Sequence, residues 1–286
     1  MQLAVCKRMH VGAQAFRAWP VWDLSPGLRA FIVSITAVYA AALVLAADVA
    51  RVTARDLFLF TVLLLCITTT VELTKRAGEN AGVIKDVYAV WELPIAILLP
   101  PVFALLAPMV RIGLLQYRIR RIPAHRRVFS AAALGLSFGL ASVGFRVIGP
   151  LVTGPGGLMA PGHYPPAQVA GWVLAVAAAG VIQWTANQVL VLPAIKASDP
   201  CQRVRDMIFN RERLLNDTTE LSVAVLVTLG IAVSLITIVF ALPFVTLLQR
   251  SVRHAQLLNA SRIDSKTGLL NACLLYTSPS PRDRQK

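Results

Sequence analysis

The chain has 286 residues, of which 56% are hydrophobic and 15% are charged, and its mean hydropathy is +0.65. Soluble domains carry roughly a quarter charged residues, so this composition excludes a soluble protein and indicates one membrane domain. The formal net charge is +14. The basic residues lie in short connectors between apolar runs, however, which disfavours a nucleic-acid-binding surface.

The first two apolar runs, residues 28–47 and 57–73, have the length that a membrane-spanning helix requires. Residues 1–27 precede them, and their apolar stretches are interrupted by polar residues and Pro20, unlike the hydrophobic region of a signal peptide. We therefore expect a cytoplasmic N-terminal segment over residues 1–27, with the first run retained as a membrane anchor.

The third apolar run, residues 87–115, is too long for one comfortable span and contains Pro100 and Pro101, which lack backbone donors. We expect a bend near Pro100 that folds this run into a helical hairpin. Glu92 and Arg111 then lie on opposite arms at comparable depth, where an ion pair would lower the cost of burying either charge. The alternative is that Arg111 extends to the membrane surface and Glu92 lies near an interface.

Residues 128–148 and 169–192 are two further predicted spans. Gln183 and Asn187 are four residues apart in the second of them, so they share a helix face, with Trp184 beside them. These three side chains are candidates for a ligand-binding pocket inside the membrane, as are Glu92 and Arg111 of the third run. The alternative is that the amides hydrogen-bond across helices and only stabilise the bundle.

The last apolar run, residues 221–248, has Gly230 and Ser234 near its middle and Pro243 further on, so it too is expected to bend into two short helices. A hairpin arm of about 14 residues covers about 21 Å, against about 30 Å of hydrocarbon. The arms of both hairpins must therefore extend into their polar flanks.

The distribution of Lys and Arg predicts the orientation, because short cytoplasmic loops accumulate these residues. Residues 111–127 contain six arginines and no acid, whereas residues 149–168 contain no Asp, Glu, Lys or Arg. We expect the first segment and the basic connector over residues 193–220 in the cytoplasm, and residues 149–168 outside. If both long runs are hairpins, both chain ends are cytoplasmic. We favour eight helical segments over residues 28–248, four full spans and two hairpins, with six simple spans as the alternative.

The sequence contains no recognisable metal site or catalytic motif. The four cysteines are Cys6, Cys66, Cys201 and Cys273. They are far apart and lack metal-ligand spacing, so neither a disulfide nor a metal site is expected. No catalytic triad or phosphate-binding loop is recognisable either, so we assign no catalytic residue.

The stretch after the last apolar run, residues 249–263, predicts a mildly basic helix that leaves the membrane. Val252, Ala255 and Leu258 recur at helical spacing, which favours a short parallel pairing with a second copy of the chain. We therefore expect a cytoplasmic signalling helix and a homodimer.

The next segment, RIDSKTGLLNA, resembles the opening of GGDEF domains, whose first motif reads Asp-x-x-Thr-Gly-Leu-x-Asn, and in particular the form common in actinobacterial membrane-bound diguanylate cyclases. The matching residues are Asp264, Thr267, Gly268, Leu269 and Asn271. The stretches HRRVFSAAALGLSFG, WTANQVLV and LPFVTLLQRSVRHAQ are similar to membrane regions of multi-span cyclic-di-GMP signalling proteins, although they point to no particular ligand.

The resemblance implies the membrane sensory and dimerisation module of a diguanylate cyclase, reaching only the start of the GGDEF domain at residues 264–272. The nucleotide- and metal-binding turn of that domain does not occur in the chain, so we expect no enzyme activity from it. Mg²⁺ and GTP are expected only for the missing domain. The final stretch, CLLYTSPSPRDRQK at residues 273–286, resembles a translated sequencing-library adapter rather than evolved protein.

This interpretation implies an all-α polytopic protein of the bacterial inner membrane. Its expected partners are the lipid bilayer, a second copy of the chain and an unidentified stimulus or ligand, with no nucleic acid. A small transporter or permease, with a substrate site at the face of Gln183 and Asn187, is the alternative. A membrane scaffold without a ligand is the third possibility.

Overall fold

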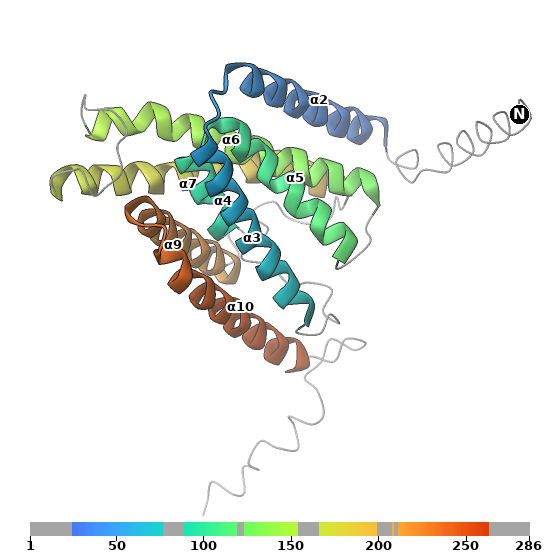
Figure 1. Ribbon diagram of the computed structural model, residues 1–286. Helices are drawn as coiled ribbons and strands as arrows, with labels where there is room; N and C mark the ends of the chain where they lie inside the picture. The colour runs from blue at the N-terminus through green and yellow to red at the C-terminus, as the bar shows by residue number, and fades with distance from the viewer. Residues whose placement is uncertain are drawn as a thin grey trace, which may run out of the picture.

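The computed structural model describes residues 25–76, 89–118, 123–153, 166–198, 208 and 211–262. Within these ranges the chain forms a bundle of helices (Figure 1). The helices in chain order are α2 (Pro26–Val49), α3 (Ala54–Arg76), α4 (Ala89–Leu98), α5 (Pro101–Arg118), α6 (Ala124–Thr153), α7 (Pro166–Ser198), α9 (Arg211–Val233) and α10 (Thr237–Arg262). The all-α fold is therefore confirmed for the part of the chain that is described.

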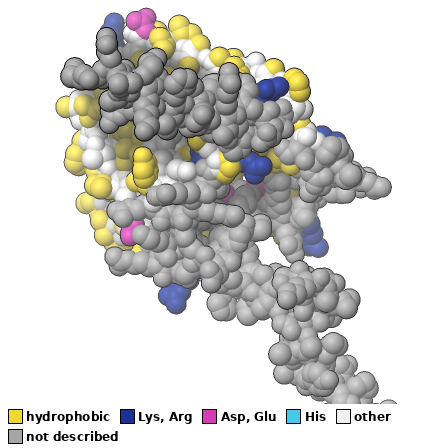
Figure 2. Space-filling model, turned by 90° about the vertical axis from the view of Figure 1, so that its right-hand side faces the viewer, with side chains coloured by type: hydrophobic (Ala, Val, Ile, Leu, Met, Phe, Trp, Pro, Cys, Tyr) yellow, Lys and Arg dark blue, Asp and Glu magenta, His cyan; other side chains and the backbone are white. Residues whose placement is uncertain are grey.

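Five of the described helices are long and apolar enough to cross a membrane, namely α2, α3, α6, α7 and α9. Two more contain shorter apolar stretches, Pro101–Tyr117 in α5 and Thr237–Leu248 in α10. Large apolar side chains are exposed on every candidate span, including Val44, Leu65 and Leu174. Yellow hydrophobic side chains cover much of the described surface in Figure 2. Such a surface suits lipid and would promote aggregation in water, so the protein is a membrane protein.

Both expected helix breaks are present. The run over residues 87–115 is interrupted at Leu99 and Pro100, because a residue that precedes proline is disfavoured in the helical region and a proline donates no backbone hydrogen bond. The run over residues 221–248 is interrupted at residues 234–236. Pro243 lies inside α10 and does not end it.

The connector expected over residues 193–220 is shorter in the structure, and its predicted bounds were wrong. Helix α7 continues through Pro193 to Ser198, and α9 already begins at Arg211. Pro193 has no N–H and so removes one backbone hydrogen bond of α7. The helix nevertheless continues past it to Ser198. The residues before Leu221 include Arg, Glu and Leu, which favour helix, so α9 starts well before its continuous apolar part.

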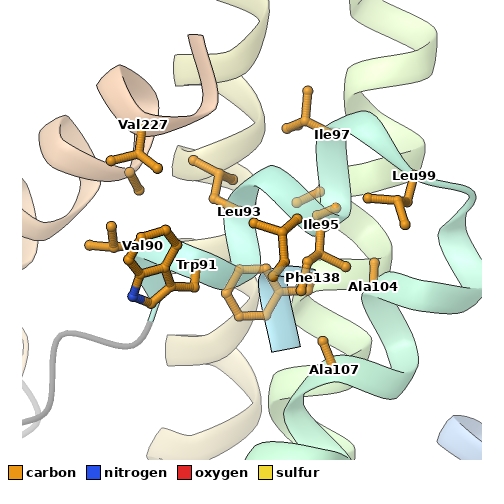
Figure 3. Close-up of a cluster of buried hydrophobic side chains, with 14 of the residues drawn as sticks. Val90, Trp91, Leu93, Ile95, Ile97, Leu99, Ala104, Ala107, Phe138 and Val227 are labelled. Carbon is orange, nitrogen blue, oxygen red and sulfur yellow. The ribbon is translucent and has the colours of Figure 1, made fainter. Parts of the chain in front are cut away.

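Helix α4 lies at the centre of the core. All residues from 90 to 97 are buried, because α4 packs against α3, α5, α6 and α9 and is apolar on nearly every side. Figure 3 shows part of this cluster, with Phe138 of α6 beside Ile95 and Val227 of α9 approaching from another side. The central helix therefore contacts both halves of the chain.

The most extensive helix pair is α6 with α7, and small residues allow its close approach. A Cβ atom at Gly171 would lie 2.5 Å from the carbonyl oxygen of Val152, which leaves no room for a larger residue. Helix α2 is fixed to α5 by Tyr39, whose hydroxyl donates to the carbonyl oxygen of Leu105 at 2.9 Å. Of these helices, α5, α6 and α7 also contribute residues to the polar cavity described below.

Candidate functional site

A cavity of about 180 Å³ lies among α4, α5, α6, α7 and α9. Its lining includes all five residues that the sequence singled out as candidates for ligand binding: Glu92, Arg111, Gln183, Trp184 and Asn187. The structure therefore brings together two groups of residues that the sequence could only suggest separately. Ligand binding at this place remains a prediction.

Glu92 and Arg111 form a buried ion pair. The Nε of Arg111 donates to Oε1 of Glu92 at 2.8 Å, and the two side chains are 10% and 1% exposed, Arg111 being the more exposed. The break at Leu99 and Pro100 makes this contact possible, because it turns α5 back along α4. The ion pair is thus confirmed over the alternative in which the two charges go to separate interfaces.

Trp184 links two walls of the cavity. Its Nε1 donates to Oδ2 of Asp217 at 2.8 Å, which joins α7 to the first turns of α9. Gln183 and Asn187 lie beside it on the same wall. Asn187 is 11 residues from the nearer end of α7, or about 16 Å of helix, so this side of the cavity lies well inside the candidate span. Ionisable residues within apolar membrane helices, such as Glu92, usually mark a functional site.

Two buried oxygen atoms of the cavity wall have no hydrogen-bond partner among the residues that the structure describes. They are Oε2 of Glu92 and Oδ1 of Asn187. Both are hydrogen-bond acceptors, and an unpaired acceptor away from water costs free energy. Both acceptors belong to residues that line the cavity, so a donor that reached them from the cavity would remove this cost.

Sequence reasoning missed Asp217 and Glu220, which also line the cavity. They were assigned to a connector because their flank is polar. A signal was nevertheless present: Asp217, Glu220, Leu221 and Ala224 follow the helical spacing of one face, and all four line the cavity. Reading the periodicity across the boundary of the apolar run would have found them.

Arg146 stabilises the break beside the site. Its Nη2 donates to the carbonyl oxygen of Leu99 at 2.7 Å. A carbonyl at the end of a helix has no partner within the helix, and Arg146 supplies one from α6. The position of α4 therefore depends on a side chain from a different element.

Several predicted features lie outside the described residues. They comprise residues 1–24, Cys6, Cys201, the motif residues Asp264, Thr267, Gly268, Leu269 and Asn271, and residues 273–286. The backbone of α10 is described as far as Arg262. Cys66 is a free, buried cysteine. Within the described ranges, no group of three or more His, Cys, Asp or Glu residues could hold a metal ion.

No protein-family model matches the chain, and neither a curated protein nor a solved structure matches it. The function is therefore inferred from the geometry of the cavity and from the short motif after α10.

Proposed function

We propose that the chain is the membrane sensory and dimerisation module of a diguanylate cyclase, whose catalytic GGDEF domain begins at residues 264–272. The observation that supports this most directly is the path from the cavity to the motif. Helix α9 supplies Asp217 and Glu220 to the cavity wall and leads through residues 234–236 into α10. Helix α10 ends at Arg262, two residues before Asp264.

The mechanism that follows is a change in the position of α9 on binding. A molecule in the cavity contacts α9 directly, and α9 packs on both α4 and α10. If the bound molecule has a higher affinity for one arrangement of these helices than for another, it shifts the population of the protein toward that arrangement. We call α10 the exit helix, because in this proposal it leaves the membrane. In a dimer, two paired exit helices would pass the shift to two GGDEF domains, which in this family each hold one GTP.

The proposed topology has four full spans, α2, α3, α6 and α7, and two hairpins, α4–α5 and α9–α10, in a bacterial inner membrane. Helix α4 is short but need not face lipid, because backbone that is surrounded by protein is tolerated at membrane depth. Each hairpin returns the chain to the side from which it entered. Both termini are then cytoplasmic, where GTP is available.

The genomic sequence after codon 272 tests the proposal. We expect an open reading frame that encodes a complete GGDEF domain, and the full-length protein should raise cyclic di-GMP in a strain that lacks other diguanylate cyclases. An early natural stop codon, or a full-length protein that makes no cyclic di-GMP under any growth condition, would contradict it.

A permease is the second candidate, and the observation that favours it is the polar cavity beside the interrupted α4–α5 pair. Transporters place their substrates beside such broken helices near the middle of the membrane. Uptake of a bound molecule into proteoliposomes, driven by an ion gradient, would support the permease. Binding without uptake would favour the sensor.

A further inference from the structure

The unpaired atoms of the cavity wall restrict what it can bind. Oε2 of Glu92 and Oδ1 of Asn187 are buried acceptors without a partner among the described residues, and they come from different helices, α4 and α7. A ligand that donates to both would remove the cost of leaving two acceptors unpaired. A ligand that carries only acceptors would leave that cost in place and add repulsion from the Glu92 carboxylate.

The charges of the wall point in the same direction. Glu92, which supplies one of these acceptors, is a carboxylate, and a carboxylate attracts a cation and repels an anion. Its other oxygen, Oε1, already accepts from Nε of Arg111. The aromatic residues Phe138 and Trp184 also line the cavity, and aromatic rings favour a neighbouring cation over an anion.

The size of the cavity suits a small molecule. A volume of about 180 Å³ is slightly more than the roughly 150 Å³ of an engineered protein cavity that binds benzene. One ring with a short substituent, or a short aliphatic chain, would fill it. The apolar side chains of Leu93, Leu134 and Phe138 suit the carbon part of such a molecule.

We infer that this cavity is a binding site for a small protonated amine, whose N–H groups donate to Glu92 and Asn187 while its carbon part lies against the apolar wall. The inference rests on the proposed function in one respect, since it names the ligand class of the proposed sensor. The binding site itself is independent of the GGDEF domain.

Benzylammonium is a suitable probe, with benzyl alcohol and benzoate as its neutral and anionic counterparts. Titration calorimetry on the chain in lipid nanodiscs, with empty nanodiscs as the blank for partition into lipid, should detect binding of benzylammonium. Benzyl alcohol should bind at least about tenfold more weakly, because it cannot donate to both acceptors, and benzoate should not bind. Equal or tighter binding of benzyl alcohol or benzoate, or no binding of benzylammonium, would overturn the inference.

The variant Asn187→Leu removes one acceptor and leaves the ion pair of Glu92 and Arg111 intact. It should weaken benzylammonium binding by about tenfold or more. The matched control is Val189→Leu, at an exposed position on the same helix, which should bind as the wild type does. Unchanged binding in Asn187→Leu would overturn the inference, and the three-ligand comparison on the wild type decides it if that variant does not fold.

The binding assay and the cyclic di-GMP assay can fail separately. Binding of benzylammonium without any effect on cyclic di-GMP would contradict the sensor and leave the amine site standing. A GGDEF reading frame after codon 272, together with the absence of amine binding, would support the sensor and overturn the amine site.

Discussion

At the scale of single residues, the fold accommodates charge by pairing it. Glu92 is 1% exposed and lies in the most buried helix of the bundle, yet it carries a carboxyl group. Its contact with Arg111 offsets part of the cost of removing both groups from water. The pair is therefore a structural requirement as well as part of the cavity wall.

Removal of one member of this pair should be far more damaging than removal of both. Arg111→Met leaves the Glu92 carboxylate buried without its partner, and we expect it to lower the free energy of unfolding by about 3–5 kcal/mol. The double variant Glu92→Leu with Arg111→Met should lose much less. Unfolding by SDS titration in mixed micelles measures both. A single variant as stable as the wild type would show that Arg111 does not compensate Glu92.

Two glycines provide a matched test of helix packing. Gly171→Ala places a methyl group 2.5 Å from the Val152 carbonyl oxygen, so α6 and α7 must separate, at a cost of about 1–3 kcal/mol. A Cβ atom at Gly113 would meet nothing within 4 Å, so Gly113→Ala should be neutral or stabilising by up to about 1 kcal/mol. The same SDS titration compares them, and equal effects would argue against the close α6–α7 contact.

At the scale of helices, the positions at which helices break and end determine which side chains meet and which helices are connected. The break between α4 and α5 brings Glu92 to Arg111, and the turn between α9 and α10 connects the cavity wall to the exit helix. The first break is held by Arg146, whose guanidinium hydrogen-bonds the Leu99 carbonyl.

Loss of this cap should loosen α4 locally. Arg146→Leu leaves the Leu99 carbonyl without its donor, and we expect it to cost about 1–3 kcal/mol. Faster amide exchange in α4 and the start of α5 should accompany the loss, as measured by hydrogen exchange with mass spectrometry. Arg146→Lys keeps a donor and should restore much of the protection. Unchanged exchange in Arg146→Leu would show that the hydrogen bond does not hold the break.

The sequence predicted where helices form and break, because apolar length and proline act locally. It placed one break at Pro100 and expected another within residues 221–248, where Gly230, Ser234 and Pro243 were the candidates. It offered the Glu92–Arg111 pair as one of two alternatives, from the comparable depth of the two residues. It did not predict the bond between Trp184 and Asp217 or the shared cavity. Those depend on how α7 and α9 are rotated and tilted against each other, which the packing of the whole bundle decides. The bounds of α9 were also wrong, since a polar flank was taken as a loop.

At the scale of the whole molecule, signalling by this chain depends on which side of the membrane each connector occupies. Basic segments accumulate on the cytoplasmic side. In the proposed topology the two hairpins place residues 111–127, the basic segment before α9 and both chain ends there, whereas the connector between α2 and α3, with Arg51 and with Arg55 at the start of α3, lies outside. The proposed function requires that the exit helix delivers the segment resembling a GGDEF opening to the compartment that contains GTP. A reversed orientation would separate the motif from its nucleotide.

Cysteine labelling in intact cells tests this orientation most directly. In a chain whose four cysteines are replaced, Val52→Cys, Tyr117→Cys and Arg250→Cys each place one thiol at an exposed position. We predict that a membrane-impermeant maleimide reaches position 52 from outside, but reaches positions 117 and 250 only after the cells are permeabilised. Labelling of position 250 in intact cells would place the end of α10 outside and contradict the signalling function.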